Sequence, residues 1–380
     1  RPGQEPTMTT DDIQGRVNAL LEEAEELDYG AERIAKCEEA VRLADEAKHD
    51  VAGYDARLGL IQAAVFGGWP EKGFVAFGWC VAKVDAEPER FRESRALKGF
   101  GLLGTDLLWV YKWMTLQVPW YPQLAREQLD RTLDDMERRY KKHGLSLRPV
   151  HMNRTRVALE CDPDPAAAKA HYDKWQWSPR DHYADCEACE ISFRVDYLVE
   201  RGEYERAFEV AAPLLDGRKK CAEVPHVTYG YLLEPARALG RDELASTLSE
   251  KGLALVEGQR DFVATVAQHV AHLVKRGDLE RARVLFERHL PFAVGNRIPK
   301  RVLDYYVVGR DLFDALADAG TTASLHAPKE LGYRGDLSDL RAIAAHFAAE
   351  ADPIAGRFDA RNGNDLVSRR TRTGAHAPVR

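Results

Sequence analysis

Hydrophobic residues recur at helical spacing along almost the whole chain. Apolar positions three and four apart alternate with charged ones, and Gly or Pro interrupts the pattern at short intervals. No run of alternating apolar and polar residues between turn signals predicts a strand. We therefore predict an all-α protein with helices over residues 11–27, 31–49, 53–67, 70–85, 89–117, 121–143, 146–161, 164–176, 185–200, 203–216, 225–239, 241–257, 260–276, 278–290, 299–319 and 336–351.

The predicted helices form pairs, and the pairs repeat. Residues 197–215 align with 272–290 without a gap, and 236–255 fit the same frame. A Gly accepts the left-handed conformation that closes a helix, and a small Ala lets the next helix pack closely against the first. In each copy a Gly ends one helix and an Ala lies five residues later: Gly202 and Ala207, Gly240 and Ala245, Gly277 and Ala282.

The turn Gly202-Glu203-Tyr204, followed by Ala207, resembles the inter-helix turn of the tetratricopeptide repeat, Gly-Asp/Glu-Tyr-x-x-Ala. The resemblance is clearest over residues 185–290, although the turn glycines are 38 and 37 residues apart, against 34 in the family. It implies an α-solenoid of stacked antiparallel helix pairs that forms a right-handed superhelix.

The composition predicts three segments. Residues 11–352 are expected to form the solenoid, and residues 1–10 a disordered N-terminus or a cloning remnant ahead of the repeats. Residues 353–380 are expected to form a disordered basic tail. Their last twenty residues hold five Arg and one Asp among small polar residues, too little apolar surface to offset the entropy of ordering.

Charge and hydropathy exclude several classes of protein. The chain has 380 residues and a formal net charge of −7, so it lacks the basic footprint of a nucleic-acid binder. The most apolar long run, 100–122, is interrupted by Asp106 and Lys112, which predicts a buried helix and no membrane span. Six cysteines and no signal-peptide pattern favour a cytoplasmic protein without a disulfide framework.

Sequence signatures of catalysis are missing. There is no Gly-x-Ser-x-Gly elbow, no His-Glu-x-x-His and no phosphate-binding Gly-x-x-x-x-Gly-Lys loop. Carboxylate pairs are abundant, but on Glu-rich helices they usually form solvated faces. We expect a protein that is not an enzyme.

A solenoid of helix pairs offers a concave groove, and the resemblance implies which residues face it. The position six residues before the turn glycine picks out Asp196 and Glu234. Alignment of Ala167 with the repeat alanine puts Arg156 at the equivalent place, and Arg237 lies about one turn beyond Glu234. These four charged residues are the predicted partner-binding residues, for a protein or peptide. The alternative, that they are ordinary exposed charges, stays open.

Tryptophan is concentrated in the first third of the chain. Two interpretations stay open: a large buried core, since aromatic side chains dominate cores, or a cleft for an apolar peptide anchor. The residues concerned are Trp69, Trp79, Trp109, Trp113 and Trp120.

The stretch "HYADCEACE" places Cys186 and Cys189 three apart on one face of a predicted helix. Cys221 and His226 stand just before and at the start of the next first helix. Neighbouring first helices of a repeat array run side by side, so the four side chains are expected to converge with the ligand types of a structural zinc site. His182 is a second candidate for the fourth ligand. Simple buried thiols and a redox pair remain as alternatives.

These observations favour a non-catalytic scaffold of the tetratricopeptide kind, with a regulatory or sensor role, that binds a protein or peptide in its groove. The alternative is a zinc-dependent or redox-active module centred on residues 182–226. The sequence does not indicate the partner or the oligomeric state.

Overall fold

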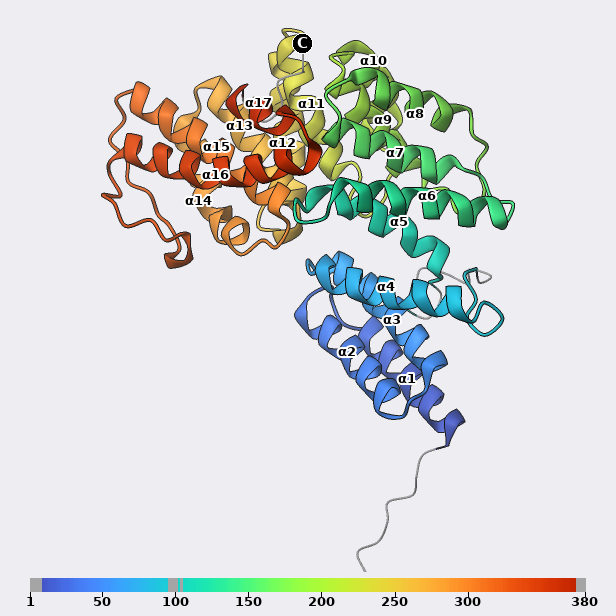
Figure 1. The fold of residues 1–380 in the computed structure, drawn as a ribbon. Coiled ribbons are helices and arrows are strands. Elements are labelled where there is room, and N and C mark those ends of the chain that lie inside the picture. Colours follow the sequence, from blue (N-terminus) through green and yellow to red (C-terminus); the bar gives the residue numbers. More distant parts are fainter. Residues whose placement is uncertain (1–8, 95–101, 103–104, 374–380) are drawn as a thin grey trace, which may run out of the picture. The chain divides into compact units, whose positions relative to one another are not determined.

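The computed structural model describes residues 9–94, 102 and 105–373. These residues form seventeen α-helices and three short 3-10 helices (Figure 1). They contain no strand, only an isolated bridge between Cys221 and Val224. Most helices pack against the helix that precedes or follows them in the chain. The predicted all-α fold built from neighbouring helices is confirmed.

The chain divides into two compact units, where the sequence suggested one continuous solenoid. Unit 1 comprises Arg1–Val118 and Arg131–Val150, and unit 2 comprises Pro119–Asp130 and His151–Arg380. The division falls in the stretch where the sequence predicted an unusually long helix pair. Each unit is therefore described separately.

Unit 1 is built from helices that pack in chain order, α1 on α2, α2 on α3 and α3 on α4. The sequence predicted one helix over 89–117, but residues 88–94 form turns and bends. The next helix starts at Leu107, because Asp106 Oδ1 accepts a hydrogen bond from the Trp109 backbone N–H at 2.8 Å and caps it. The helices are α1 (Thr10–Glu25), α2 (Ala31–Glu46), α3 (Asp50–Phe66), α4 (Pro70–Ala86), α5 (Leu107–Gln117) and most of α6 (Arg126–Lys142).

The aromatic residues of unit 1 pack as a core. Trp109 and Tyr111 are buried, and the ring of Trp113 stands edge-on to Phe66 and to Trp109. Trp79 is covered by the guanidinium of Arg57, 4.0 Å from the ring centroid. The core interpretation of the tryptophan cluster is therefore favoured over a cleft in this unit.

Unit 2 repeats one packing arrangement. Helix α9 contacts α10 and also α11, α11 contacts α12 and α13, and α13 contacts α14 and α15. Each pair is thus stacked on the next through its first helix, as expected for a helical repeat. The helices are α7 (Arg148–Cys161), α8 (Pro165–Trp177), α9 (Glu187–Glu200), α10 (Tyr204–Leu215), α11 (His226–Ala238), α12 (Asp242–Val256), α13 (Val263–Arg276), α14 (Leu279–Val294), α15 (Pro299–Asp318), α16 (Leu340–Asn362) and α17 (Leu366–Thr373), with 3-10 turns η1 (Val118–Trp120), η2 (Arg260–Phe262) and η3 (Lys329–Leu331).

The turn chemistry expected from the sequence is present in three successive pairs. Gly202, Gly240 and Gly277 have φ angles of 70°, 68° and 79°, in the left-handed region. The alanine five residues after each glycine is fully buried between the two helices of its pair. Both halves of the predicted turn are confirmed.

The C-terminal segment differs from the prediction of a disordered tail over 353–380. Helix α16 continues through Pro353 to Asn362, and α17 follows after a short turn. Phe358, Leu366 and Val367 are buried, so their packing offsets the backbone hydrogen bond that the proline removes. The average composition of the tail hid these few apolar positions. Residues 374–380 and 1–8 lie outside the described part of the chain.

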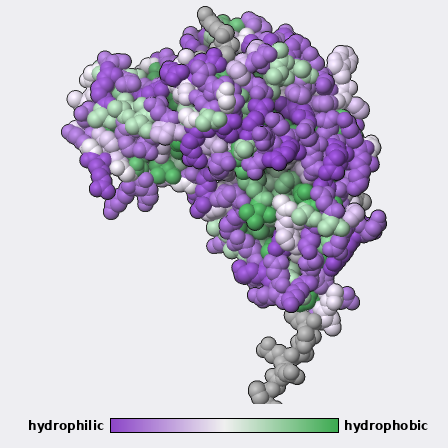
Figure 2. Space-filling model, in the orientation of Figure 1, coloured by the Kyte–Doolittle hydropathy of each residue, from purple (hydrophilic) through white to green (hydrophobic). Residues whose placement is uncertain are grey.

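The face shown in Figure 2 is mostly polar, because purple covers much of it between smaller green areas. Within the described residues, no helix combines the length and apolar character that a membrane crossing requires.

Candidate functional site

A hollow lies on the surface formed by α9, α11 and α13, the first helices of three successive pairs in unit 2. We call it the inner hollow. Its charged lining consists of Asp196, Glu200, Glu234 and Lys275. The residues predicted from the repeat frame, Asp196 and Glu234, therefore line the same hollow. Three carboxylates and one ammonium line the hollow, and two of the carboxylates, Glu200 and Glu234, also pair with the arginines Arg370 and Arg237.

Close packing of α11 against α13 forms the floor of the inner hollow. A Cβ atom at Gly230 would come within 2.1 Å of Gln268 Oε1, so the glycine on α11 leaves room for the side chain of Gln268 on α13. Gln268 Oε1 and His272 Nε2 are buried and have no hydrogen-bond partner within the described residues. Burial, and secondarily the charge of Arg276, lowers the pKa of His272 to about 4, so its imidazole is neutral at pH 7.

The carboxylates of the inner hollow differ in their electrostatic state. Burial alone would raise the pKa of Glu234, but hydrogen bonds from Arg237 and Lys275, at 2.6 and 2.9 Å, outweigh it and hold the pKa low. Burial raises the pKa of Asp196 to about 7, and the charge of Glu200 adds to the effect. Within the described residues Asp196 thus makes no ion pair like those of Glu234, although the charge of Arg156 acts on it.

The other two predicted binding residues lie beside the inner hollow. The guanidinium of Arg156 on α7 stacks over Phe193, 4.2 Å from the ring centroid, and its charge opposes the rise in the Asp196 pKa. Arg156 Nη1 is buried without a hydrogen-bond partner in the described part of the chain. Arg237 is exposed and pairs with Glu234. The structure thus brings the four predicted residues into one neighbourhood, with Arg237 at the rim.

Sequence reasoning missed the segment that packs against this surface. Arg370 on α17 donates from Nη2 to Glu200 Oε2 at 2.9 Å. The same charge lowers the pKa of Glu160 on α7, against the effect of burial and together with Lys300. Asn364, just before α17, donates to the Cys161 carbonyl at 2.9 Å. A signal was present in the apolar pair Leu366 and Val367, followed by arginines within a helical turn.

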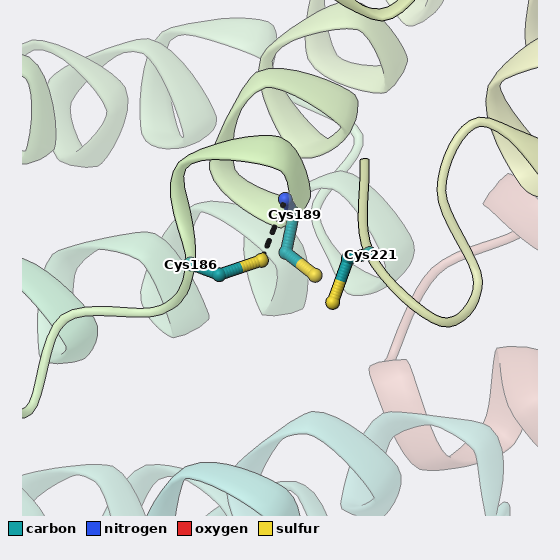
Figure 3. Close-up of side chains that lie close together, drawn as sticks. All are labelled: Cys186, Cys189 and Cys221. Atoms are coloured by element: carbon teal, nitrogen blue, oxygen red, sulfur yellow. Dashed lines mark hydrogen bonds between the residues drawn. The ribbon is translucent and has the colours of Figure 1, made fainter. Parts of the chain in front are cut away.

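Three cysteines converge elsewhere in unit 2 (Figure 3). The Sγ atoms of Cys186, Cys189 and Cys221, the thiol cluster, lie within 4.8 Å of one another. Cys186 caps α9, and its Sγ accepts from the Cys189 backbone N–H at 3.4 Å. Cys221 stands in the loop before α11, in a tight turn closed by reciprocal backbone hydrogen bonds with Val224. These are the three thiols predicted from the sequence to converge.

The surroundings of Cys189 and Cys221 favour the protonated form of these two thiols. Burial raises the pKa of Cys189, and its neighbour Cys186 adds to the effect. Burial and Cys186 also raise the pKa of Cys221. Three adjacent thiolates repel one another, so ionisation of the whole cluster requires a positive charge between the sulfurs. A soft metal ion supplies that charge.

The predicted fourth ligand lies outside the cluster. His226 is the first residue of α11, and its imidazole stacks on Phe262, with the ring centroids 5.4 Å apart. His182 is exposed and its ring leans on Tyr183. The repeat frame located the backbone of His226 correctly, but packing against Phe262 directs the side chain away from the sulfurs. Of the four predicted metal ligands, the structure brings together three.

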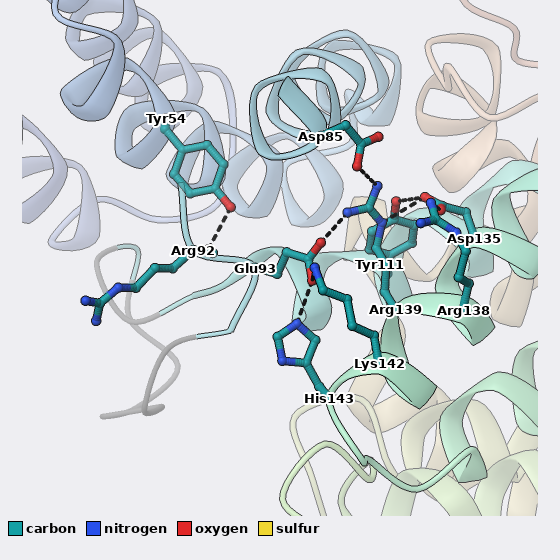
Figure 4. A network of polar contacts seen from close by, with 10 residues as sticks. All are labelled: Tyr54, Asp85, Arg92, Glu93, Tyr111, Asp135, Arg138, Arg139, Lys142 and His143. Carbon is teal, nitrogen blue, oxygen red and sulfur yellow. Dashed lines mark hydrogen bonds and ion pairs between the residues drawn. The ribbon is translucent and has the colours of Figure 1, made fainter. Parts of the chain in front are cut away.

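Unit 1 holds a buried network of charges that the sequence did not reveal (Figure 4). The side chain of Arg139 is 1% exposed and pairs with Asp85, Glu93 and Asp135. Glu93 is also buried and contacts His143 Nε2. The partners of Arg139 include residues 46 and 54 positions away in the chain, and no motif links them. Because every charge has a partner, the network fixes the segment after α4 to α6 and has a structural character.

The chain matches no protein-family model and no curated protein. The roles of the inner hollow and the thiol cluster are therefore inferred from the chemistry of their own residues. The first presents carboxylates to a surface helix, and the second presents three soft ligand atoms.

Proposed function

We propose that this chain is a non-catalytic binding protein of the tetratricopeptide kind, and that its inner hollow holds a basic helical peptide of a protein partner. The observation that carries the proposal is the contact of α17, where Arg370 pairs with Glu200 at the hollow. A basic helix already lies against this surface, so the surface suits a segment of that chemistry. The left-handed glycine turns of three successive pairs support the repeat assignment.

Charge complementarity supports a basic partner. Glu200 and Glu234 already pair with cations, whereas Asp196 makes no ion pair within the described residues and gains most from an added cation, because its pKa is raised by burial. An arginine is the favoured side chain, since its planar guanidinium binds a carboxylate through two parallel hydrogen bonds. A partner that brings a second arginine to Asp196 would make a contact that α17 does not make.

Helix α17 gives the protein a regulatory character. A partner helix that uses Glu200 must first displace Arg370, so binding and release of the C-terminal helix are coupled. We therefore propose a sensor or regulatory role in the cytoplasm, in which occupation of the inner hollow frees α17. The released helix is a change that other proteins can detect.

A peptide with the sequence of residues 363–373 tests the proposal. A chain that ends at Asn362 should bind the fluorescent peptide, and the full chain should bind it far more weakly because α17 competes. An Arg370→Glu peptide should bind at least about tenfold more weakly, because the reversed charge both loses the pair with Glu200 and is repelled by that carboxylate. A full chain that carries Arg370→Glu serves as a second receptor, should the shortened chain not fold.

Two results would contradict the proposal. One is equal binding of the native and Arg370→Glu peptides. The other is unchanged binding of the native peptide to a Glu200→Gln receptor, since that substitution removes the carboxylate on which the contact with Arg370 depends.

The thiol cluster favours a second function, the binding of one zinc ion that links the start of α9 to the loop before α11. The convergence of three thiols from these two segments carries it, because zinc in proteins favours thiolate ligands. Purified protein should contain about one zinc per chain, and the Cys186→Ser variant should lose it. Metal-free wild-type protein that forms a Cys–Cys bond on mild oxidation would favour the redox alternative instead.

A further inference from the structure

The thiol cluster lies at the protein surface, where solvent reaches it. Cys186 and Cys221 are exposed, and Cys189 is half-buried. Within the described residues, no fourth His, Cys, Asp or Glu belongs to the group. His226, expected to close the site, is held in its stack on Phe262. In Figure 3 the sulfurs of Cys189 and Cys221 point to the same side of the start of α9.

We infer that the thiol cluster is an open metal site, in which three thiolates hold one zinc ion and the fourth position takes an exchangeable thiol from solution. The inference rests on the zinc binding proposed above and specifies its coordination. A site with four protein ligands is closed and structural, whereas three protein ligands leave one position for an outside ligand.

The positions of the sulfurs suit this coordination. Zinc–sulfur bonds of about 2.3 Å in a tetrahedron place the sulfurs about 3.8 Å apart, and the three Sγ atoms already lie within 4.8 Å of one another. Cys186 stands at the N-cap of α9, and its Sγ accepts from the Cys189 backbone N–H at 3.4 Å, so these two residues are held side by side. Only small side-chain movements are therefore needed to bind the ion.

A thiolate is the favoured fourth ligand. The loop that carries Cys221 also carries Arg218, Lys219 and Lys220, but Arg218 pairs with Asp216 and Lys219 with Glu187. Asp185 directly precedes Cys186. The charges around the cluster are therefore mixed and do not select the ligand. The softness of the metal selects it, because a zinc ion held by three thiolates takes a fourth soft sulfur in preference to a neutral oxygen ligand.

Binding of the small thiol is a ligand exchange at the metal. The thiol loses its proton to solvent, its sulfur forms a bond to zinc, and the bound water leaves. No electron is transferred, and the three protein thiolates stay bound. Because the position faces solvent, exchange requires no opening of the fold.

Cobalt(II) is the probe, since its absorption reports both the thiolate ligands and the coordination geometry. Reduced, metal-free full chain should bind one Co²⁺ with a thiolate charge-transfer intensity that corresponds to three sulfurs. Addition of 2-mercaptoethanol should increase this intensity by about one third and shift the visible bands. His226→Ala should behave like the wild type, and Cys221→Ser should lose about one third of the intensity.

Other results would overturn the inference. Bands that do not respond to 2-mercaptoethanol, together with loss of Co²⁺ binding in His226→Ala, would show a closed site and leave the zinc function intact. Failure of wild-type protein to bind Co²⁺ or Zn²⁺ would remove both. Cys37→Ala is the matched control, because Cys37 is fully buried in unit 1 and outside the cluster; a change in its spectrum would also count against the assignment.

Discussion

Arg370 Nη2 donates to Glu200 Oε2 at 2.9 Å, and each side chain keeps 22% of its surface exposed. This pair joins the last described helix to the first helix of the best-formed repeat. Glu200 also lines the inner hollow. This ion pair thus contributes to holding α17 and occupies a carboxylate that a partner would use.

Loss of this pair should loosen α17 without unfolding unit 2. A partly exposed ion pair contributes about 1 kcal/mol or less, so Glu200→Gln should lower the melting temperature by only a few degrees. Trypsin should, however, cleave after Arg370 several times faster than in the wild type. Arg369→Gln is the control, since Arg369 is exposed and, within the described residues, pairs only with the nearby Asp365. Equal cleavage rates in both variants would show that the pair does not hold the helix.

Removal of α17 should destabilise unit 2 measurably. Leu366 and Val367 are almost fully buried, and burial of each such side chain is worth about 1.5–3 kcal/mol. At about 2–4 °C per kcal/mol for a domain of this size, a chain that ends at Asn362 should melt several degrees below the full chain. Scanning calorimetry measures this. A chain that ends at Thr373 is the control and should melt like the full chain.

Binding of a basic peptide should release a proton when Asp196 takes part. The pKa of Asp196 is raised to about 7 in the folded chain, and a cation beside it would lower that value. Affinity should therefore rise as the pH increases from 6 to 8, because the carboxylate need not be deprotonated first. Titration calorimetry in buffers of different ionisation enthalpy detects the proton. Asp196→Asn should abolish the buffer dependence; its persistence would assign the proton to another group.

The same shift makes a prediction for stability. A carboxyl whose pKa is higher in the folded chain than in the unfolded chain binds more protons when folded. Its effect is therefore to lower stability as the pH rises from about 4 to about 7. Asp196→Asn mimics the neutral form, so the variant should gain melting temperature relative to the wild type at pH 8 but not at pH 4. A pH-independent difference between the two proteins would contradict the assignment.

The charge network of unit 1 should be sensitive to Arg139. Arg139→Met leaves Glu93 and Asp135 without their central cation, and breaking a buried pair costs about 3–5 kcal/mol. In the wild type, burial opposes the lowered pKa values of Glu93 and Asp135, but the surrounding cations and hydrogen bonds outweigh it. The difference in the free energy of unfolding between the wild type and the variant should therefore shrink as the pH falls below about 4 and the carboxyls become protonated.

Urea denaturation at pH 7 and at about pH 3, followed by tryptophan fluorescence, measures both effects. Arg138→Met is the matched control, since its side chain is 65% exposed although it also pairs with Asp135. It should cost less than about 1 kcal/mol. Similar costs for the two variants would mean that burial of the network contributes little.

The repeat of unit 2 was predictable because its signals are local. Gly202 marks the turn because it adopts the left-handed backbone conformation, and Ala207 marks it because a small side chain is needed for close packing. Both signals lie within a few residues of each other in the sequence. The thiol cluster followed from the same frame, as Cys186 and Cys221 occupy related places at the starts of successive pairs. The helix around Pro353 was not predictable, since proline predicts an end and only the distant packing of Phe358 overrides it.

The directions in which side chains point could not be predicted from the sequence. The frame placed His226 at the start of α11, but a helix start permits several directions, and the choice depends on Phe262, which the chain brings alongside from the next pair. The network of Arg139 is similar, because its partners come from separate elements and share no spacing. Such contacts depend on how the helices stack, which local pattern does not specify.

The short connection between α16 and α17 sets how strongly an outside partner must bind. Only residues 363–365 separate the two helices, so α17 remains at the inner hollow at an effective concentration in the millimolar range, typical of short linkers. A free peptide of equal intrinsic affinity stays largely excluded until its own concentration becomes comparable. A natural partner must therefore bind much more tightly than α17 does, through Asp196 or through contacts beyond the hollow. The tether thus acts as a concentration threshold that filters out weak basic peptides.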